Sequence, residues 1–536
     1  MLASARWVKL GRVNRFRVMK IPIGHRNPVK MLFASLTVFL WLGSIAHSQD
    51  HLSRALKLLQ EGNLSAAERE AQAAVADPST RARANATLGA IRLQQRKYAE
   101  SEEYLRSAIR YDTRLVEAHI NLGTVCNFQG KFAPAAEAFR SALALNPRIS
   151  SAWRGLAQAE AARGEYRASL EAAKRVLGEL RKSVTGLLLL ATDYAGLKDD
   201  ASVHGVLADW NALPQTDATS AINLASILET EGYLADAIAV LENAKKTGPL
   251  SFALSFTLAG CYLQSGDLTR ASANYVVALS FDDNCIPCYR QIAAIAEKQR
   301  DLDQALSYLL MATRKAPQDP DILEAFGWVC MEKDLIDDAA KAFDKALEIR
   351  PGHESTMYKR ASAHVGKKEY EAAVRLLEEL VNRHPNDSGL NYALGSVLYL
   401  SVRLDESEKY LRRSVEFDPN VANSHQYLGL VLEGQNRVPE AIQTLEETAR
   451  RFPDYAPAFE ALGTLLFKNG NFPEAQKALE RSIELNPDSM KAHYQLGMLL
   501  ARAGKKQDSQ AQLQIYKELQ AKEQSQPQQV FLLTPP

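Results

Sequence analysis

The chain of 536 residues has few aromatic side chains, few cysteines and no excess of either charge. Phe, Trp and Tyr together make up 8% of the residues, and five cysteines in a chain of this length exclude a disulfide-dense scaffold. The 64 basic and 63 acidic side chains give a formal net charge of +1. Because nucleic-acid binding depends on a basic surface, we expect no nucleic-acid partner.

The sequence also lacks the common catalytic and cofactor-binding motifs. It contains no P-loop, no HExxH zinc motif, no GxSxG nucleophile elbow and no dinucleotide-binding glycine motif. The repeats described below occupy nearly all of the chain after the first 48 residues, which leaves no room for a catalytic domain of about 100 residues. We therefore predict a protein that is not an enzyme and that uses no cofactor and no metal.

The N-terminal apolar stretch is short for a membrane-spanning helix. Leu32–Ala46 covers 15 residues, whereas a span needs about 20. Eight basic and no acidic residues lie within the first 48 positions, and Ala46-His47-Ser48 follows the apolar stretch. This order is typical of a signal peptide, so we expect an exported protein, periplasmic or extracellular. The alternative is an uncleaved signal anchor at residues 31–46, which would be the only membrane contact.

Without that leader the chain is mildly acidic, with 56 bases against 63 acids, and it is dominated by a 34-residue repeat. Thirteen units keep one register, starting at residues 82, 116, 150, 184, 218, 252, 286, 320, 354, 388, 422, 456 and 490. One copy shows the pattern as Leu122-Gly123, Gly130, Phe132, Ala135, Phe139, Ala142 and Pro147. Below, a residue's position in its unit is counted from these starts.

The residue types at these positions predict two antiparallel helices per unit. Glycine near the middle permits the tight turn between the helices. Small residues at the eighth and twentieth positions allow the helices to approach closely, and proline is tolerated where the second helix ends. Since one unit cannot bury its own apolar face, neighbouring units must stack.

This pattern resembles the tetratricopeptide repeat family, which adds an aromatic residue at the fourth position, matched by Trp153. The resemblance implies an all-α, right-handed superhelical solenoid of tandem helix-turn-helix units. We assign residues 1–48 to the signal peptide or anchor and 49–81 to a degenerate first unit. Residues 82–319 hold the N-terminal and middle units, 320–517 the C-terminal units with a capping helix, and 518–536 a disordered tail.

Two units depart from the pattern. The unit at 184 has Lys198 in place of the turn glycine and Trp210 at the twenty-seventh position. The unit at 354 has Arg360 at the seventh position and Leu380 at the twenty-seventh, where the family has alanine. We expect these two units to be the least regular of the array.

The resemblance also implies a concave groove lined by the first helices, in which a protein or peptide binds. Groove residues of the family come from the second, fifth, ninth, twelfth and thirteenth positions. From about residue 320 onward these positions are rich in aromatic side chains, which suit recognition because they offer large area at low entropic cost. The predicted groove residues are Arg290, Trp328, Met331, Tyr358, Tyr392, Tyr399, Leu430, Phe467, Tyr494 and Met498. The alternative is that these side chains pack against neighbouring helices.

Cys285 and Cys288 form a CxxC pair at the junction of two units. In an exported protein we expect them to form a structural disulfide, with inert thiols or a redox or metal site as the alternatives. His119, His425 and His493 share the fourth position of their units, where we expect packing rather than metal binding.

The sequence therefore predicts a scaffold or adaptor for protein–protein interaction in the cell envelope. One alternative is an accessory subunit that presents substrates to a transferase or to an envelope assembly machine. A second is a thiol–disulfide function of the CxxC pair.

Overall fold

The computed structural model describes residues 49–214 and 216–524, and every regular element in this part of the chain is a helix. The predicted leader, residues 1–48, and the last twelve residues, 525–536, lie outside the described residues. None of the described helices combines the length and apolar character needed to cross a membrane.

The described chain forms two compact units. The first contains residues up to 216 together with 223–233, and the second contains residues 217–222 together with everything from 234 onward. The grouping at residue 320, made from the aromatic content of the groove, remains a prediction.

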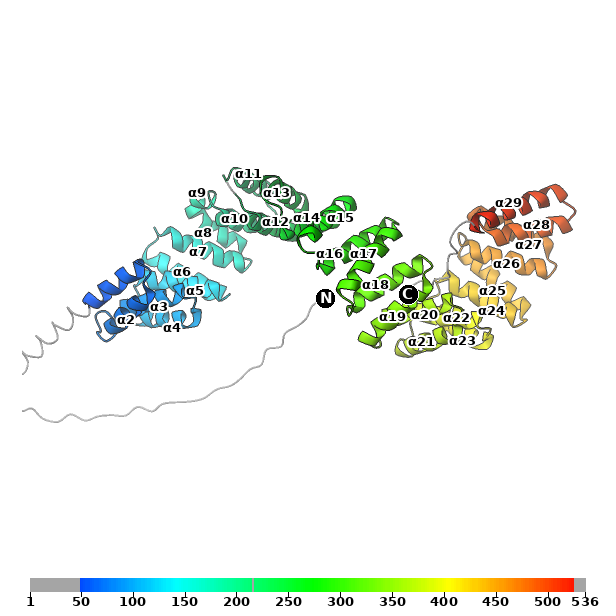
Figure 1. Ribbon diagram of the computed structural model, residues 1–536, viewed down its shortest axis with the longest axis horizontal. Coiled ribbons are helices and arrows are strands. Elements are labelled where there is room, and N and C mark those ends of the chain that lie inside the picture. Colours follow the sequence, from blue (N-terminus) through cyan, green and yellow to red (C-terminus); the bar gives the residue numbers. More distant parts are fainter. Residues whose placement is uncertain (1–48, 215, 525–536) are drawn as a thin grey trace, which may run out of the picture. The chain divides into compact units, whose positions relative to one another are not determined.

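In the first unit, residues 49–60 are helical and are followed by a series of paired helices (Figure 1). These are α2 (Leu64–Ala74), α3 (Arg81–Gln94), α4 (Tyr98–Tyr111), α5 (Val116–Phe128), α6 (Phe132–Leu145), α7 (Ser150–Ala162), α8 (Tyr166–Ala173), the 3-10 turn η1 (Lys174–Val176), α9 (Leu177–Leu180), α10 (Val184–Gly196) and α11 (Asp200–Asn211). Helix α12 (Ala218–Thr230) contributes residues to both units.

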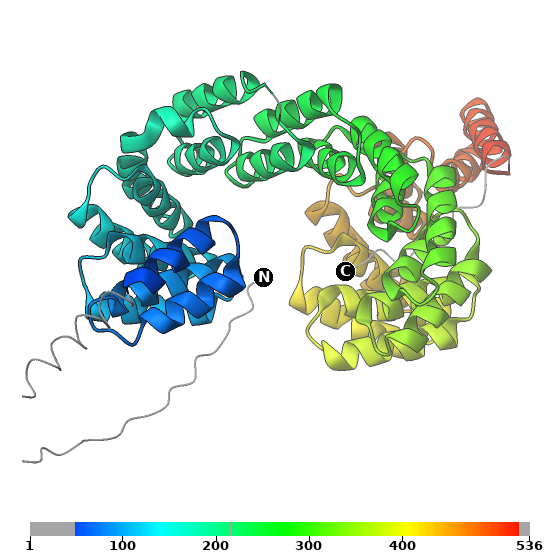
Figure 2. The ribbon, with the colours of Figure 1, turned by 60° about the vertical axis from the view of Figure 1, so that its left-hand side comes forward.

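The second unit continues the same alternation to the end of the described chain (Figure 2). Its helices are α13 (Leu234–Thr247), α14 (Phe252–Ser265), α15 (Leu268–Phe281), α16 (Ile286–Lys298), α17 (Leu302–Lys315), α18 (Pro320–Glu332), α19 (Ile336–Ile349), α20 (Glu354–Gly366), α21 (Tyr370–Arg383), α22 (Ser388–Leu400), α23 (Leu404–Phe417), α24 (Ala422–Gly434), α25 (Val438–Arg451), α26 (Ala456–Lys468), α27 (Phe472–Leu485), α28 (Met490–Arg502) and α29 (Lys506–Gln524). Residues 518–524, assigned to the tail from the sequence, belong to α29.

The helix boundaries follow the sequence register closely. Twelve of the thirteen first helices begin at the first residue of their 34-residue unit, and α3 begins one residue earlier. All thirteen second helices begin at the seventeenth position. The predicted all-α array of tandem helical hairpins is therefore confirmed.

The turn between the two helices of each unit has one residue with positive φ, always at the fifteenth position. Glycine occupies it in units such as the one at 116, where Gly130 has φ 72°. Seven units place another residue there, including Lys198 at φ 58° and the β-branched Val402 at φ 63°. The turn geometry is thus set by packing of the two helices, which overrides the preference of most residues for negative φ.

In the units that have glycine at the eighth position, the close approach of the two helices leaves no room for a side chain there. A Cβ atom on Gly123 would lie 2.8 Å from the ring of Phe139, and one on Gly463 would lie 2.7 Å from Cγ of Leu479. In both pairs the large residue stands sixteen positions after the glycine. The prediction that the two helices approach each other closely at small residues is confirmed.

Fourth-position side chains hold the loop that precedes their helix. In six units, a polar atom at this position lies within hydrogen-bond distance of the backbone carbonyl six residues earlier. These pairs are His119 with Thr113, Trp153 with Pro147, Tyr289 with Asp283, Asn391 with Pro385, His425 with Pro419 and His493 with Pro487, at 2.8–3.1 Å. The three histidines predicted to pack thus have a structural role in joining neighbouring units.

The expectation of irregular units is wrong for the unit at 354, whose helices α20 and α21 have ordinary lengths. In the unit at 184, α11 has 12 residues, two fewer than α6 or α15. The larger departure is in the unit at 150, where the second helix is divided into α8, η1 and α9. Val176, with φ −132° and ψ 18°, leaves the helical region, and Gly178 follows as a weak helix former.

Candidate functional site

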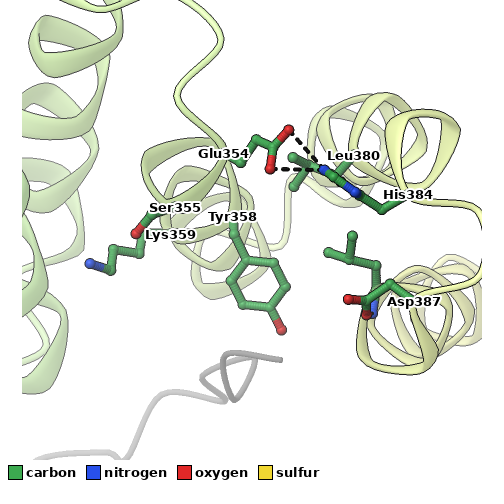
Figure 3. Close-up of a pocket in the computed structure, with 8 residues that line it drawn as sticks. Glu354, Ser355, Tyr358, Lys359, Leu380, His384 and Asp387 are labelled. Atoms are coloured by element: carbon green, nitrogen blue, oxygen red, sulfur yellow. Dashed lines mark hydrogen bonds and ion pairs between the residues drawn. The ribbon is translucent and has the colours of Figure 1, made fainter. Parts of the chain in front are cut away.

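First helices of successive repeats contact one another within the second unit, from α22 through α24 and α26 to α28, and α18 contacts α20. These helices carry all of the predicted groove residues except Arg290, which lies on α16. A pocket of about 360 Å³ opens between α20, the end of α21 and the start of α22 (Figure 3). Its lining residues are Glu354, Ser355, Tyr358, Lys359, Leu380, His384, Asp387 and Leu390.

The apolar part of this pocket comes from Tyr358, Leu380 and Leu390, one residue from each of the three helices. All three are nearly enclosed, with Tyr358 at 5% exposure, and Tyr358 also belongs to the core cluster of α20–α22. Burial and the neighbouring Tyr392 raise the pKa of the Tyr358 hydroxyl, so it stays neutral. The pocket thus has a rigid, apolar floor that is fixed by the packing of the helices.

Acidic groups stand at the rim. Glu354 and His384 face each other in Figure 3, with both Glu354 oxygens 2.9 Å from Nε2 of His384. This hydrogen bond lowers the pKa of the Glu354 carboxyl. Asp387 is the N-cap of α22 and accepts a 2.8 Å hydrogen bond from the backbone N–H of Leu390. Capping fixes the Asp387 side chain in the mouth of the pocket.

Lys359, the one lysine of the pocket lining, is held by the preceding repeat. Its Nζ donates a 2.6 Å hydrogen bond to Glu324 of α18, which also accepts from Ser355 and Thr356. Burial alone would raise the pKa of Glu324, but these hydrogen bonds outweigh it and lower the pKa to about 2. Because Glu324 neutralises Lys359, the carboxylates left at the pocket mouth are Asp387 and Glu354, and Glu354 also lies 3.7 Å from a guanidinium nitrogen of Arg383.

A cluster of tyrosines continues from the pocket along the first-helix surface. The ring of Tyr427 makes edge contacts with Tyr392 and with Tyr399, each with centroids 5.7 Å apart. Tyr455 donates a 2.7 Å hydrogen bond to Oε1 of Gln426. Burial raises the pKa of all four of these tyrosines. The cluster is therefore an apolar, neutral surface with only part of its area exposed.

The structure places the ten predicted groove residues in three environments. Met331, Tyr358 and Tyr392 are buried; Trp328, Tyr399, Leu430 and Phe467 are half-buried; Arg290, Tyr494 and Met498 are exposed. Met331, Tyr358 and Tyr392 all belong to core clusters, as the packing alternative expects. Tyr358 is the member that lines a pocket, and binding by this set remains a prediction.

The repeat pattern did not indicate the pocket residues that lie outside the family's groove positions. Leu380 and His384 come from the end of a second helix, and Asp387 precedes the next first helix. The signal that could have indicated them was Leu380 itself, the large residue found where most units have a small one. The predicted groove residues likewise included only Tyr392 and Tyr399 of the tyrosine cluster, because Tyr427 and Tyr455 lie at positions outside the groove pattern.

The CxxC pair lies away from this pocket, at the start of α16. The Sγ atoms of Cys285 and Cys288 are 2.11 Å apart, as in a disulfide, and the backbone N–H of Cys288 lies 3.2 Å from Sγ of Cys285. Cys285 is 5% exposed and Cys288 is fully buried. The remaining thiols are buried too, and burial raises the pKa of Cys330 to about 12. Within the described residues no group of His, Cys, Asp and Glu side chains could hold a metal ion.

Comparisons with known proteins agree with the repeat geometry. The model of the tetratricopeptide repeat matches residues 128–183, 291–354, 358–422 and 460–524. Human Protein O-mannosyl-transferase TMTC1 is 25% identical over 189 residues. That match covers 34% of this chain and spans only 21% of the length of the human protein.

Among solved structures, a tetratricopeptide repeat protein from Parabacteroides merdae ATCC 43184 is similar at 18% identity and a TM-score of 0.37, over 46% of this chain and 98% of that one. MamA from Desulfovibrio magneticus RS-1 is 25% identical with a TM-score of 0.30, over 31% of this chain and 94% of that one. With thirteen helical hairpins in one register and four segments matched by the repeat model, this chain belongs to the tetratricopeptide repeat family, whose repeats form scaffolds for protein–protein interaction.

Proposed function

We propose that the protein is an exported scaffold that holds a segment of another protein on the first-helix surface of its second unit. The observation that supports this proposal is the pocket between α20, α21 and α22, with its apolar floor and acidic rim. A volume of about 360 Å³ lies at the lower end of the range of small ligand pockets and suits one bulky side chain.

The lining defines the chemistry of the bound segment. Tyr358, Leu380 and Leu390 offer apolar area for an aromatic or large aliphatic side chain. Glu354 and Asp387 at the mouth favour a lysine or arginine beside that side chain, because opposite charges across an interface increase specificity and the rate of encounter. The partner is thus a segment that carries a bulky apolar residue next to a basic one, with the tyrosine cluster contacting the residues beyond.

A peptide-display selection on the full chain tests this chemistry. We expect enrichment of peptides that contain a bulky apolar residue adjacent to Lys or Arg. Ser355 is exposed at the pocket wall, so Ser355→Trp should fill the pocket and weaken binding of the enriched peptides by about tenfold or more, the typical effect of losing an anchor residue.

Ser151→Trp is the matched control, because Ser151 is exposed at the same repeat position of the unit at 150. Affinity should be unchanged in this variant, and circular dichroism should show both variants folded. Enriched peptides without the apolar–basic pair, or equal binding to the two variants, would contradict the proposal.

Export is the second part of the proposal and is supported by the base-rich start and short apolar stretch of residues 1–48. N-terminal sequencing of the protein recovered from the envelope fraction tests it. A mature chain that begins after Ala46 or Ser48 is expected for a cleaved signal, and retention of residues 31–46 in the membrane fraction would favour the anchor. Recovery of the protein only from the cytoplasm would contradict export.

An accessory role beside a transferase is the alternative function, supported by the partial likeness to human Protein O-mannosyl-transferase TMTC1. In that case the repeats would present substrates to a separate catalytic protein. Capture with the full chain, followed by assay of the retained proteins for sugar transfer, separates the two functions. The thiol–disulfide alternative receives no support, because the burial of Cys285 and Cys288 leaves little access for another protein's thiol.

A further inference from the structure

The first unit contains a second cavity, which arises where the helix of the unit at 150 is interrupted. Neighbouring second helices such as α6 are continuous over 14 residues. Here the α-helix ends at Ala173, and the 3-10 turn η1 carries Lys174 and Arg175 before α9 begins. A cavity of about 670 Å³ lies between α6, α7, α8 and η1. Its volume falls in the range of sites for small organic ligands.

The lining of this cavity carries one more basic than acidic side chain. Arg140, Lys174 and Arg175 line it together with two carboxylates, those of Glu160 and Glu171. This small positive excess contrasts with the chain after residue 48, which carries more acids than bases.

The two carboxylates do little to repel an anion. One oxygen of Glu160 contacts Arg140, and the other accepts a 2.7 Å hydrogen bond from Arg163 outside the cavity. Glu160 is buried, and the guanidinium groups of Arg140 and Arg163 compensate its charge. Glu171 pairs with Lys174 at 2.5 Å on the surface, where both side chains are well exposed. Pairs of this kind contribute at most about 1 kcal/mol, so Lys174 is readily redirected to a ligand.

Arg175 and Trp153 form one wall of the cavity. The guanidinium carbon of Arg175 lies 5.7 Å from the centre of the Trp153 ring. The indole is fixed by its 2.8 Å hydrogen bond to the carbonyl of Pro147. Within the described part of the chain, the ion pairs of the structure do not include Arg175, and its side chain is exposed. Its planar set of N–H donors is therefore available for a carboxylate or phosphate group.

We propose that this cavity binds an organic anion. The guanidinium of Arg175 and the ammonium of Lys174 hold its carboxylate or phosphate group. Its apolar or aromatic body lies against Trp153 and Leu156. The anion is either a free small molecule or an acidic residue next to an aromatic one in a protein segment, because both present the same chemistry to the wall.

Calorimetric titration of the full chain with 2-naphthoate tests the proposal, with the neutral 2-naphthamide as the matched ligand. We expect saturable binding of the naphthoate at one site and at least about tenfold weaker binding of the amide, because the amide loses the charge-assisted hydrogen bonds. Arg175→Gln should weaken naphthoate binding by a similar factor. Arg167→Gln, a change at an exposed position of α8 outside the cavity lining, should leave it unchanged.

The dipeptide acetyl-Phe-Glu-amide and 1-naphthyl phosphate distinguish the sources of the anion. Tighter binding of the dipeptide than of either naphthalene anion, lost in Arg175→Gln, identifies a protein segment as the ligand. Tighter binding of a free naphthalene anion with the same sensitivity identifies a small molecule. Equal binding of naphthoate and naphthamide, or equal effects of Arg175→Gln and Arg167→Gln in folded variants, would overturn the proposal.

Discussion

At the scale of single residues, Asp193 is the most unusual group in the described chain. It is fully buried on α10, where one oxygen lies 2.6 Å from Oγ of Ser169 and the other has no partner. The same serine oxygen lies 2.9 Å from the carbonyl of Ala157. Ser101 and Ser407 donate to the equivalent carbonyl in their own units. A hydroxyl has one proton, so Ser169 cannot donate fully to both the Ala157 carbonyl and the Asp193 carboxylate, and the buried carboxylate is poorly supplied with hydrogen-bond donors.

Stability of the first unit should accordingly fall as pH rises. Burial raises the pKa of Asp193 to about 7, and the hydrogen bond with Ser169 offsets only part of that effect. The folded state therefore binds this proton more tightly than the unfolded chain, whose aspartate titrates near pH 4. The contribution to stability is fully present below about pH 4 and is lost as pH rises to about 7, by roughly 1.4 kcal/mol per pH unit.

Asp193→Asn should remove this part of the pH dependence, since the amide does not ionise and stays neutral at every pH. Urea unfolding of the wild type and the variant at pH 5 and pH 7.5 measures this pH dependence of stability. Hydrogen exchange in α10 serves as the readout. We expect the variant to gain stability relative to the wild type at the higher pH. Parallel profiles would show that Asp193 is ionised in the folded protein.

At the scale of helical elements, glycine allows α6 to pack closely against both α5 and α7. Phe139 on α6 packs between Gly123 on α5 and Gly155 on α7, so that a Cβ on either glycine would lie within 2.8 Å of its ring. Gly260 on α14 differs, because a Cβ there would meet no atom within 4 Å. A side chain is therefore excluded at Gly123 and tolerated at Gly260, and the neighbouring atoms decide which case applies.

Gly123→Ala and Gly260→Ala should therefore change stability in opposite directions. Overpacking against Phe139 costs about 1–3 kcal/mol, which exceeds the gain in helix propensity. At Gly260 only the propensity gain of about 1 kcal/mol applies. Denaturant unfolding of both variants measures the difference, and a stabilised Gly123→Ala would show that the helices of this unit separate without cost.

The start of α16 carries a second element-level prediction, which concerns the CxxC pair. Because Cys285 and Cys288 are paired while Cys126, Cys261 and Cys330 are not, denatured, unreduced protein from an oxidising compartment should titrate three thiols. Reduction should raise the count to five. Five thiols before reduction would show that the pair is open and would also weaken the case for export.

At the scale of the whole molecule, each repeat is stabilised by its neighbours, so the last one needs a cap. Helix α29 supplies it: Tyr516 contacts Tyr494 with ring centroids 5.3 Å apart, and Leu513 fills the space over Gly497. Beneath α29, Leu496 and Leu500 on α28 are buried. In stacked repeats the loss of such a cap affects mainly the adjacent units.

Leu513→Ala should lower hydrogen-exchange protection in α28 and α26 and leave that of the first unit unchanged. Removal of a buried leucine side chain costs about 2–5 kcal/mol, and less here because Leu513 is only partly buried. Gln514→Ala, at an exposed position of the same helix, is the control and should have no effect. Equal loss of protection throughout the chain would show one cooperative unit instead of local stabilisation.

The sequence by itself determined the helix boundaries, the position of the turns and the close approach of the helices. These features depend on contacts within 34 residues. Their residue types recur thirteen times, so a unit that departs from the pattern can still be placed by the register of the others. It also located the surface of first helices, and it placed Tyr358 on that surface.

Only the tertiary structure decided which of those side chains are accessible. Met331, Tyr358 and Tyr392 occupy groove positions yet are buried, because side chains from other positions pack against them, as Tyr427 does against Tyr392. The pocket needs Leu380 and Leu390 from two different units, and the cavity beside Trp153 needs the interruption at Val176. A repeat pattern describes what the units share, whereas the pocket and the cavity arise where neighbouring units differ. The size of each depends on packing between side chains of different helices, which the pattern does not describe.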